Sequence, residues 1–486
     1  MHRLTLLALA VPAFAATPCA DLAKLALPNT KITLADSPAP TYCRVQATLT
    51  PTPDSEIKIE VWLPEPARWN GKFKGTGNGG LGGGATVASG PLLSAIRDGY
   101  AAAGNNTGHE GGSNYALGHP EKVKDFGWRA SHEMTVTAKK LIAAFYDTPL
   151  QLSLMAESGG GTIAALSAAQ RFPEDYDILA VTSMSSYLSR HTFGQMWTWY
   201  ATHDSEASFI PPAKYAAIHQ AALKACDAQD GLADGLIGAV EKCPFDPVVI
   251  QCTLADTPAC LTVPQVAAAR KIYAGPKNPR TGEQIYSPIF PGSELGWAQL
   301  AAGAEPLSIP VDFFRGYVFQ DDKWDYKTRK LNFDSDVASA DRADISAVNA
   351  VDPDLRRYFA RGGKLLLIGG WADAAVPPAV AVNYYKAVVA KVGAKATRES
   401  MRFYMVPGMA HGVGTTGAEN FNIDTLALIE QWKQTGKAPD TLVMDHYKDG
   451  KQVGKRLICQ YPRIATYQGP GKGTSSAEDP DSFTCR

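Results

Sequence analysis

The chain has 486 residues, of which 45% are hydrophobic and 20% are charged, as in an ordinary soluble globular protein. Its formal net charge is −1 and it contains no basic stripe, so the charge pattern gives no reason to expect binding to nucleic acid or to an anionic membrane. A chain of this length is too long for one simple core, which indicates a large domain with a substantial insertion, or two domains.

The amino terminus has the pattern of a secretory signal peptide. Met1-His2-Arg3 gives a short basic start, Leu4 to Val11 are nearly all apolar, and Ala13-Phe14-Ala15 forms an Ala-x-Ala cleavage site. We therefore expect residues 1–15 to be removed and the protein to be secreted or periplasmic. No other stretch approaches the roughly 18 apolar residues of a membrane-spanning helix.

If the protein is exported, its eight cysteines are expected to form disulfides, because an oxidising compartment favours them. Neighbouring cysteines would close four short loops without crossing, and we favour this sequential pairing. A zinc site is the weaker alternative, since no Cys-x-x-Cys occurs and no histidine lies close to the central cysteines. The expected pairs are Cys19–Cys43, Cys226–Cys243, Cys252–Cys260 and Cys459–Cys485.

Apolar periodicity predicts strands and helices that alternate on both sides of one long segment. In that segment aromatics, prolines and four cysteines accumulate and the alternation is lost, so we interpret residues 185–354 as an inserted lid domain. Residues 16–184 and 355–486 then form one catalytic domain of the α/β class with a mostly parallel sheet. The expected strands are 57–63, 150–157, 178–181, 363–370 and 402–406, and the expected helices are 130–147, 162–171, 379–392 and 424–435.

The segment Gly75–Gly84 contains too many glycines for a regular element, and it allows the backbone to approach a ligand closely. As a dinucleotide fingerprint it is weak, because no parallel βαβ unit with a following acidic residue is evident. A loop that donates a backbone N–H to an oxyanion fits better. A plain surface loop is the alternative.

Ser158 lies where a predicted strand turns directly into a predicted helix. Such a strained turn, the nucleophile elbow, lifts a serine hydroxyl clear of the sheet and aims backbone N–H groups at a developing oxyanion. It requires small residues two positions before and after the serine, and Ala156 and Gly160 meet that requirement. A plain turn with a small-x-Ser-x-Gly sequence is the alternative.

Asp373 and His411 each follow the carboxyl end of a predicted strand, where open α/β sheets place their sites. Taken singly, they are compatible with a turn aspartate and a loop histidine. The order Ser158, Asp373, His411 is that of α/β-hydrolases, in which histidine takes the serine proton and a carboxylate holds the histidine tautomer.

These features resemble the tannase and feruloyl esterase family, which includes hydrolases of mono(2-hydroxyethyl) terephthalate. The resemblance implies an α/β-hydrolase fold with a large inserted lid, with Ser158 as nucleophile, His411 as general base and Asp373 as the acid that orients it. It further implies an oxyanion hole formed by the N–H groups of Gly159 and Gly80. The landmarks are Gly75–Gly84, Arg171–Asp177, Gly370–Asp373 and Val406–His411, within a match from about Cys19 to Cys485.

The sequence departs from the family beside the triad. Relatives typically carry a cysteine just before the serine and another just after the histidine, joined by a disulfide, whereas this chain has Glu157 and Gly412. Loss of the bridge predicts a looser site, although the triad chemistry does not require it. Two interpretations of Glu157 remain open: a solvated or locally paired carboxylate, and a polar tether to the His411 loop.

A loop in the predicted lid packs three carboxylates into eight residues, with glycines that permit sharp turns. Calcium is a hard cation that takes several oxygen ligands, so this composition suits a structural Ca²⁺. A solvated acidic turn is the alternative, and no organic cofactor is expected. The resemblance assigns as ligands the side chains of Asp227, Asp230 and Asp234 and the carbonyls of Leu232 and Leu236.

The sequence thus predicts an exported serine esterase that cleaves aromatic carboxylic esters, free or linked to a plant polymer, through an acyl-enzyme. Alternatives are a terephthalate monoester hydrolase of the same family, a peptidase or lipase with the same triad, and a non-catalytic polyphenol- or carbohydrate-binding relative. Lid aromatics either stack on the acyl ring or belong to the core. They are Trp197, Trp199, Phe313, Phe314 and Phe319.

Overall fold

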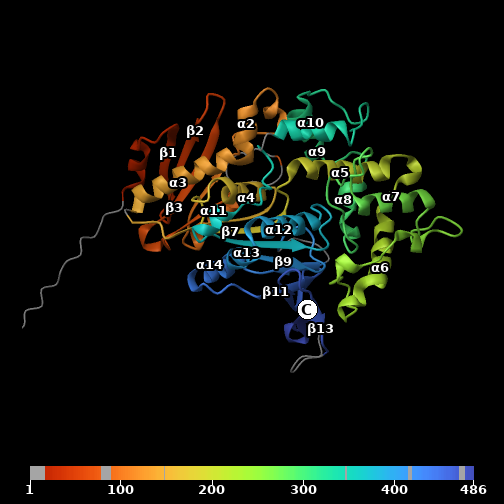
Figure 1. Cartoon of the computed structure of the whole chain (residues 1–486). Coiled ribbons are helices and arrows are strands. Elements are labelled where there is room, and N and C mark those ends of the chain that lie inside the picture. Colours follow the sequence, from red (N-terminus) through yellow and green to blue (C-terminus); the bar gives the residue numbers. More distant parts are fainter. Residues whose placement is uncertain are drawn as a thin grey trace, which may run out of the picture.

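A nine-stranded sheet forms the centre of the protein (Figure 1). The computed structural model describes residues 17–77, 81, 89–146, 148–344, 347–413, 419–469 and 477–486, so the predicted signal peptide lies outside the described residues. The strands are β1 (Thr30–Ala39), β2 (Tyr42–Leu49), β3 (Ile57–Pro64), β4 (Lys72–Gly75), β5 (Ala101–Asn105), β6 (Leu152–Gly159), β7 (Ile178–Met184), β8 (Lys364–Gly370), β9 (Met401–Val406), β10 (Glu419–Asn422), β11 (Thr441–Lys448), β12 (Lys451–Cys459), β13 (Ala465–Tyr467) and β14 (Phe483–Cys485).

The sheet has the order β1-β2-β3-β5-β4-β6-β7-β8-β9 and is mixed. The pairs from β1 to β5 are antiparallel, whereas β5, β4, β6, β7, β8 and β9 run parallel. Every residue of β7 and β9 is buried, as expected for parallel strands covered by helices on both faces. The prediction of parallel strands therefore holds for the half of the sheet that carries the candidate residues.

Helices cover the sheet, and their positions agree closely with the apolar periodicity of the sequence. The predicted helices 162–171 and 379–392 are α4 and α12 with the same bounds. The helices are α1 (Ser89–Arg97), α2 (Pro120–Lys124), α3 (Ala130–Tyr146), α4 (Thr162–Arg171), α5 (Leu188–His203), α6 (Tyr215–Cys226), α7 (Val263–Ala274), α8 (Ala298–Ala301), α9 (Ser308–Phe313), α10 (Ser335–Asp344), α11 (Arg356–Ala360), α12 (Ala379–Val392), α13 (Ala394–Ser400) and α14 (Thr425–Thr435).

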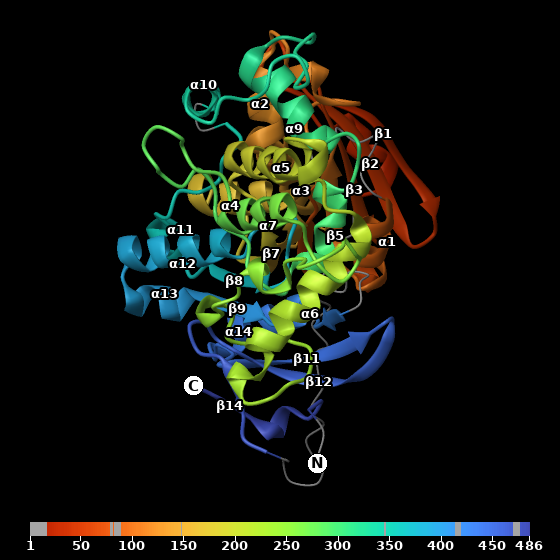
Figure 2. The same ribbon diagram turned by 90° about the vertical axis from the view of Figure 1, so that its right-hand side faces the viewer.

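The chain segment between β7 and β8 contains helices α5 to α10. This segment contributes no strand to the large sheet. Figure 1 shows α5 to α8 on the right, far from β1 and β2, and Figure 2 shows α6 and α7 in front of β7 to β9. This insertion therefore covers one end of the parallel strands. Among the described residues, no helix is long and apolar enough to cross a membrane.

Four disulfides confirm the sequential pairing of the cysteines, and no free cysteine remains. Two of them close loops in the inserted segment, and one joins the end of β12 to β14 near the carboxyl terminus. The pairs are Cys19–Cys43, Cys226–Cys243, Cys252–Cys260 and Cys459–Cys485.

Candidate active site

Three strands of the parallel half of the sheet, β6, β8 and β9, bring the predicted triad to the carboxyl ends of the strands. Ser158 is the penultimate residue of β6, Asp373 follows β8 by three residues, and His411 follows β9 by five. The loops after β8 and β9 are tied together, because the N–H of Ala372 donates to the carbonyl of Met409 at 3.1 Å. Gly370 allows this close approach: a Cβ there would lie 2.1 Å from the same carbonyl oxygen.

Asp373 and His411 form a directed pair. The Nδ1 of His411 lies 2.9 Å from Oδ2 of Asp373, whose Oδ1 accepts the N–H of Val376 at 2.8 Å. Asp373 is 1% exposed, so its carboxylate is fixed and shielded from solvent. Burial alone lowers the pKa of His411, but the hydrogen bond and charge of Asp373 outweigh it and raise that pKa above its ordinary value. This arrangement suits a general base whose Nε2 is free to take a proton.

The other ring nitrogen of His411 faces the Ser158 turn. A Cβ built on Gly159 would lie 2.8 Å from Nε2, so only a glycine leaves room for the imidazole. Gly159 has φ +56°, whereas Ser158 remains part of the extended strand. The sequence predicts a strained turn at the serine; the structure places the left-handed residue one position later, where a glycine adopts it without steric cost. Ser158 is exposed.

Helix α4 begins directly after this turn. Thr162, its first residue, donates its hydroxyl to the carbonyl of Gly159 at 2.6 Å, which fixes the Gly159 peptide relative to the helix. The N–H groups at a helix start favour negative charge. Gly80, the second predicted oxyanion donor, lies outside the described residues.

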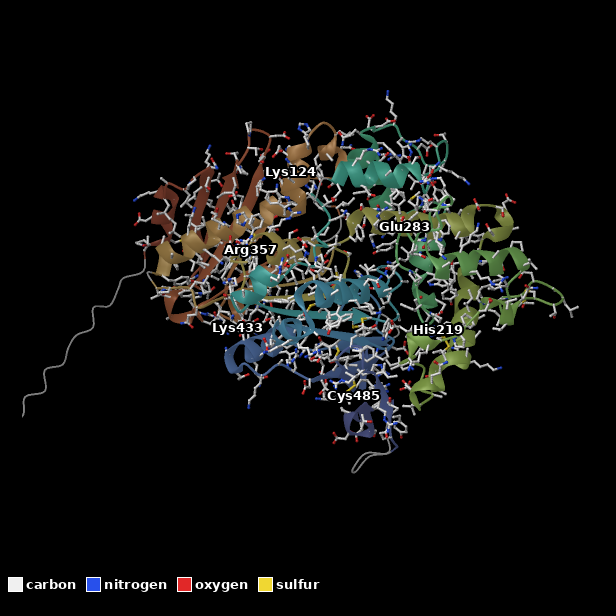
Figure 3. All side chains as sticks on the ribbon, in the orientation of Figure 1. Lys124, His219, Glu283, Arg357, Lys433 and Cys485 are labelled. Atoms are coloured by element: carbon white, nitrogen blue, oxygen red, sulfur yellow. A yellow bond between two sulfur atoms is a disulfide. The ribbon has the colours of Figure 1, made fainter. Side chains whose placement is uncertain are left out.

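A cavity of about 830 Å³ opens beside His411. The loops after β8 and β9 line one side, and the inserted segment lines the other with His219, Leu223 and Leu295. Figure 3 shows His219 on the side of the insertion that faces the sheet. The volume and mixed lining suit a small organic molecule.

The five lid aromatics suggested by the sequence do not line this cavity within the described residues. Phe313 packs edge-on against Phe314, which stacks on Phe319, and the indole N–H of Trp199 donates to a backbone carbonyl. The core interpretation therefore applies to Trp199, Phe313, Phe314 and Phe319. Trp197 is only partly buried and lines a smaller cavity of about 160 Å³ in the inserted segment.

A family model described as tannase and feruloyl esterase matches residues 43–485. The chain belongs to this family. An uncharacterized esterase of Xanthomonas campestris pv. campestris is 35% identical over 98% of this chain and 92% of its own length. A probable feruloyl esterase B-1 of Neosartorya fischeri is 29% identical over 91% and 86%, respectively. The crystal structure of feruloyl esterase B from Aspergillus oryzae covers 96% of this chain and 98% of its own, with a TM-score of 0.86 and 25% identity.

Family, fold and site agree on the chemistry of this protein. It is a carboxylic ester hydrolase with the α/β-hydrolase fold and a large inserted lid. The cavity beside His411 lies where the lid meets the strand ends, which is where such sheets bind their ligands.

Glu157, the residue before Ser158, bonds to the glycine-rich segment. Its Oε1 accepts the N–H of Gly77 at 2.6 Å. The structure therefore supports a locally paired carboxylate rather than a tether to the His411 loop.

Residues 78–80 and 82–88 lie outside the described part of the chain, but Leu81 is described, and its carbonyl lies 3.2 Å from Nε2 of the buried His109. Sequence reasoning missed this contact, because no local pattern links His109 to a loop 28 residues earlier.

We expect Glu157→Gln to stabilise the esterase at alkaline pH. Burial raises the pKa of Glu157 from 4.5 to about 7. Between these values the folded state binds the proton more tightly than the unfolded state, so wild-type stability falls as pH rises through that window. Glutamine resembles the neutral form and keeps an oxygen for Gly77. The variant should therefore match the wild type near pH 4 and exceed its unfolding free energy by about 3 kcal/mol at pH 8.

Urea unfolding at the two pH values measures this difference. Glu174→Gln, at an exposed carboxylate, serves as the matched control and should give the same result at both pH values. A Glu157→Gln effect of equal size at pH 4 and pH 8 would show that burial of the charge is not its cause.

The predicted calcium loop holds its carboxylates with backbone N–H groups. Asp227 accepts from Gly235 at 2.8 Å and from Asp234 at 3.2 Å, and the carboxylate of Asp234 also pairs with the buried Arg456. Burial, together with the charge of Asp234, raises the pKa of Asp230 to about 6, a cost that a cation would relieve. The predicted ligand atoms are all oxygens, which suits a hard cation, but the carboxylate oxygens of Asp227, Asp230 and Asp234 do not all lie within 4.8 Å of one another, and Arg456 competes for Asp234.

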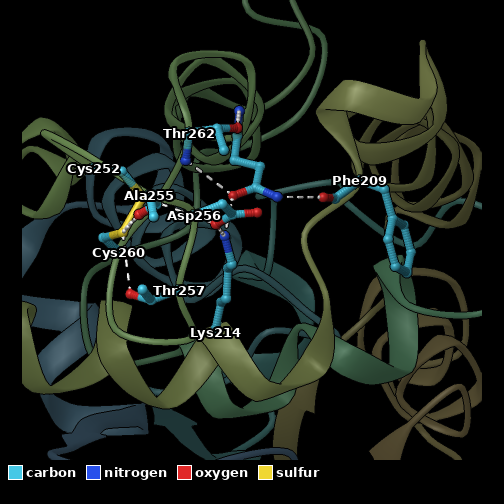
Figure 4. Close-up of polar contacts among 9 residues, drawn as sticks. Phe209, Lys214, Cys252, Ala255, Asp256, Thr257, Cys260 and Thr262 are labelled. Carbon is cyan, nitrogen blue, oxygen red and sulfur yellow. Dashed lines mark hydrogen bonds and ion pairs between the residues drawn. A yellow bond between two sulfur atoms is a disulfide. The ribbon is translucent and has the colours of Figure 1, made fainter.

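A second cluster has the composition of a metal site but not its chemistry. Ligand atoms of Cys252, Asp256 and Cys260 lie within 4.8 Å of one another, the only such group among the described residues. Figure 4 shows that the two sulfurs are joined in a disulfide and that Asp256 pairs with Lys214. Oxidised sulfurs are not thiolate ligands, so this cluster is a structural crosslink beside an ion pair.

Proposed function

We propose that the protein is a secreted serine esterase that hydrolyses aromatic carboxylic esters, such as feruloyl, galloyl or related aryl esters, through an acyl-enzyme. One observation carries the mechanism: Nε2 of His411 faces the Ser158–Gly159 turn while Nδ1 is held by Asp373 at 2.9 Å. The signal-peptide pattern of residues 1–15 and four disulfides support export. The names of the fungal relatives, which are feruloyl esterases, support an aromatic acyl group in the substrate.

In the proposed reaction, Ser158 Oγ attacks the ester carbonyl carbon as His411 takes its proton. The tetrahedral oxyanion is stabilised by the N–H of Gly159, with Gly80 as the second donor, and the start of α4 adds a favourable field. The imidazolium then protonates the leaving alcohol, giving the acyl-enzyme. Water, deprotonated by His411, releases the acid and regenerates Ser158. Asp373 keeps the proton on Nδ1 throughout.

A terephthalate monoester is a second candidate substrate, because Lys224 and Lys448 line the cavity and their ammonium groups suit a free carboxylate. A panel of methyl ferulate, methyl gallate, a terephthalate monoester and a long-chain acyl ester separates the candidates. We expect the highest kcat/KM on one of the aromatic esters. Preference for the long-chain ester would indicate a lipase instead, and binding of methyl ferulate without turnover of any ester would indicate a binding protein.

We further propose that Asp227, Asp230 and Asp234, with the carbonyls of Leu232 and Leu236, hold a structural Ca²⁺. The ion would fix the lid loop that follows α6, part of which lines the cavity. It supplies charge balance and takes no part in ester cleavage.

We expect millimolar CaCl₂ to raise the melting temperature by a few degrees over protein in EDTA, since a ligand bound only by the folded state stabilises it. Asp230→Asn should abolish this increase. Asp256→Asn, which changes an aspartate outside the loop, should retain it. Equal melting temperatures of the wild type in CaCl₂ and in EDTA would contradict the calcium site.

A further inference from the structure

The strand beside the nucleophile contains an irregularity at Ser183. Ser158 pairs with Thr182 and Gly159 pairs with Met184, so Ser183 is one extra residue in β7 opposite the nucleophile turn. A bulge of this kind redirects a side chain, and bulges are frequent beside active sites. The local pairing therefore singles out Ser183 within a strand that is otherwise regular.

The backbone of Ser183 is strained as well as irregular. Its φ is +47°, in the left-handed region that is sterically unfavourable for a non-glycine residue. Of the five non-glycine residues with positive φ in the described part of the chain, it is the only one inside a strand. Strain of this type persists where the surrounding structure needs the conformation.

This backbone conformation places the Ser183 hydroxyl beside the loop that carries His411. Its Oγ accepts the N–H of Gly412 at 2.8 Å, and Ser183 is 3% exposed. Gly412 directly follows His411 and has φ +88°. The His411 side chain is 40% exposed, so packing encloses only part of the ring and the position of its backbone also affects where the ring lies.

We propose that Ser183 is a positioning residue. Its hydroxyl fixes the backbone at Gly412 so that Nε2 of His411 faces Ser158. The bond joins the histidine loop to β7, the strand that pairs with the Ser158 turn. The pair of strands β6 and β7 therefore holds both Ser158 and the loop that carries His411. The inference rests on the proposed serine-esterase function.

Two substitutions distinguish positioning from a structural role. Ser183→Ala removes the acceptor and should lower kcat on p-nitrophenyl acetate about 10-fold to 100-fold, with KM within about 2-fold, because small displacements of catalytic groups have effects of this size. Ser183→Gly removes the hydroxyl and also relieves the strain at φ +47°. It should melt at a higher temperature than Ser183→Ala and yet be equally slow. If the backbone conformation alone mattered, Ser183→Gly would be as active as the wild type.

Ser153→Ala is the matched control, because Ser153 is a buried serine of β6 whose hydroxyl bonds to Asp177 at the other end of the sheet. It should leave kcat unchanged. Labelling of Ser158 by a fluorophosphonate, followed by intact mass, gives a second readout that does not depend on the substrate cavity. Ser183→Ala and Ser183→Gly should both slow labelling about 10-fold or more.

The labelling experiment separates the two proposals. A wild type that is not labelled, or a Ser158→Ala variant that is labelled equally, would overturn the serine-esterase function. A wild type labelled at Ser158, together with Ser183 variants labelled at the same rate, would overturn the positioning role alone. Slow labelling of both Ser183 variants beside a normal Ser153→Ala supports it.

Discussion

Ser158→Ala is expected to lower kcat/KM on p-nitrophenyl acetate by about 10⁴-fold to 10⁶-fold, since alanine leaves His411 with no hydroxyl to activate. The residual rate would come from binding and from the oxyanion donors. Ser158 is exposed, so the substitution removes no core packing, and the melting temperature should stay within about 1 °C of the wild type.

Initial rates of the purified variant, compared with the wild type at the same pH, measure this loss. Mass spectrometry of the wild type stopped during turnover should show one acyl group on Ser158, and none on the variant. A variant that keeps more than about 1% of the wild-type rate would show that another residue is the nucleophile.

Asp373→Asn is expected to lower kcat about 10⁴-fold, because the amide no longer holds the proton on Nδ1 of His411 and the wrong tautomer is favoured. It should also shift the pH profile. Activity requires neutral His411, so the wild-type rate falls as pH drops through the raised pKa of this histidine. Without the charge of Asp373 only the burial effect remains, which lowers that pKa, and the acid limb should move to lower pH.

A second histidine–aspartate pair, in which only the aspartate is buried, provides the control. Nδ1 of His132 lies 2.8 Å from Oδ2 of Asp175, which is 3% exposed and belongs to a different region of the catalytic domain. Asp175→Asn should leave kcat and the acid limb unchanged. Steady-state rates between pH 5 and pH 9 test both variants. An unshifted acid limb in Asp373→Asn would show that His411 is not the group that titrates.

The sequence alone determined the strands and helices that flank the candidate site and the order of the three predicted catalytic residues. Apolar periodicity set the bounds of α4 and α12, and residues just past strand ends identified Asp373 and His411, because in parallel strands carboxyl ends meet at one edge. The disulfides also followed from the sequence, since short loops favour pairing of neighbours. These are local properties, and local sequence is sufficient to specify them.

Only the tertiary structure decided which groups hold the residues next to Ser158 and His411. Glu157 bonds to Gly77, 80 residues away, and Ser183 reaches Gly412 across 229 residues. The left-handed residue of the nucleophile turn proved to be Gly159, because His411 occupies the space that a Cβ would fill. Such partners depend on which strands become neighbours and where a bulge falls, and a hydrogen bond between distant residues leaves no periodic signal in the chain.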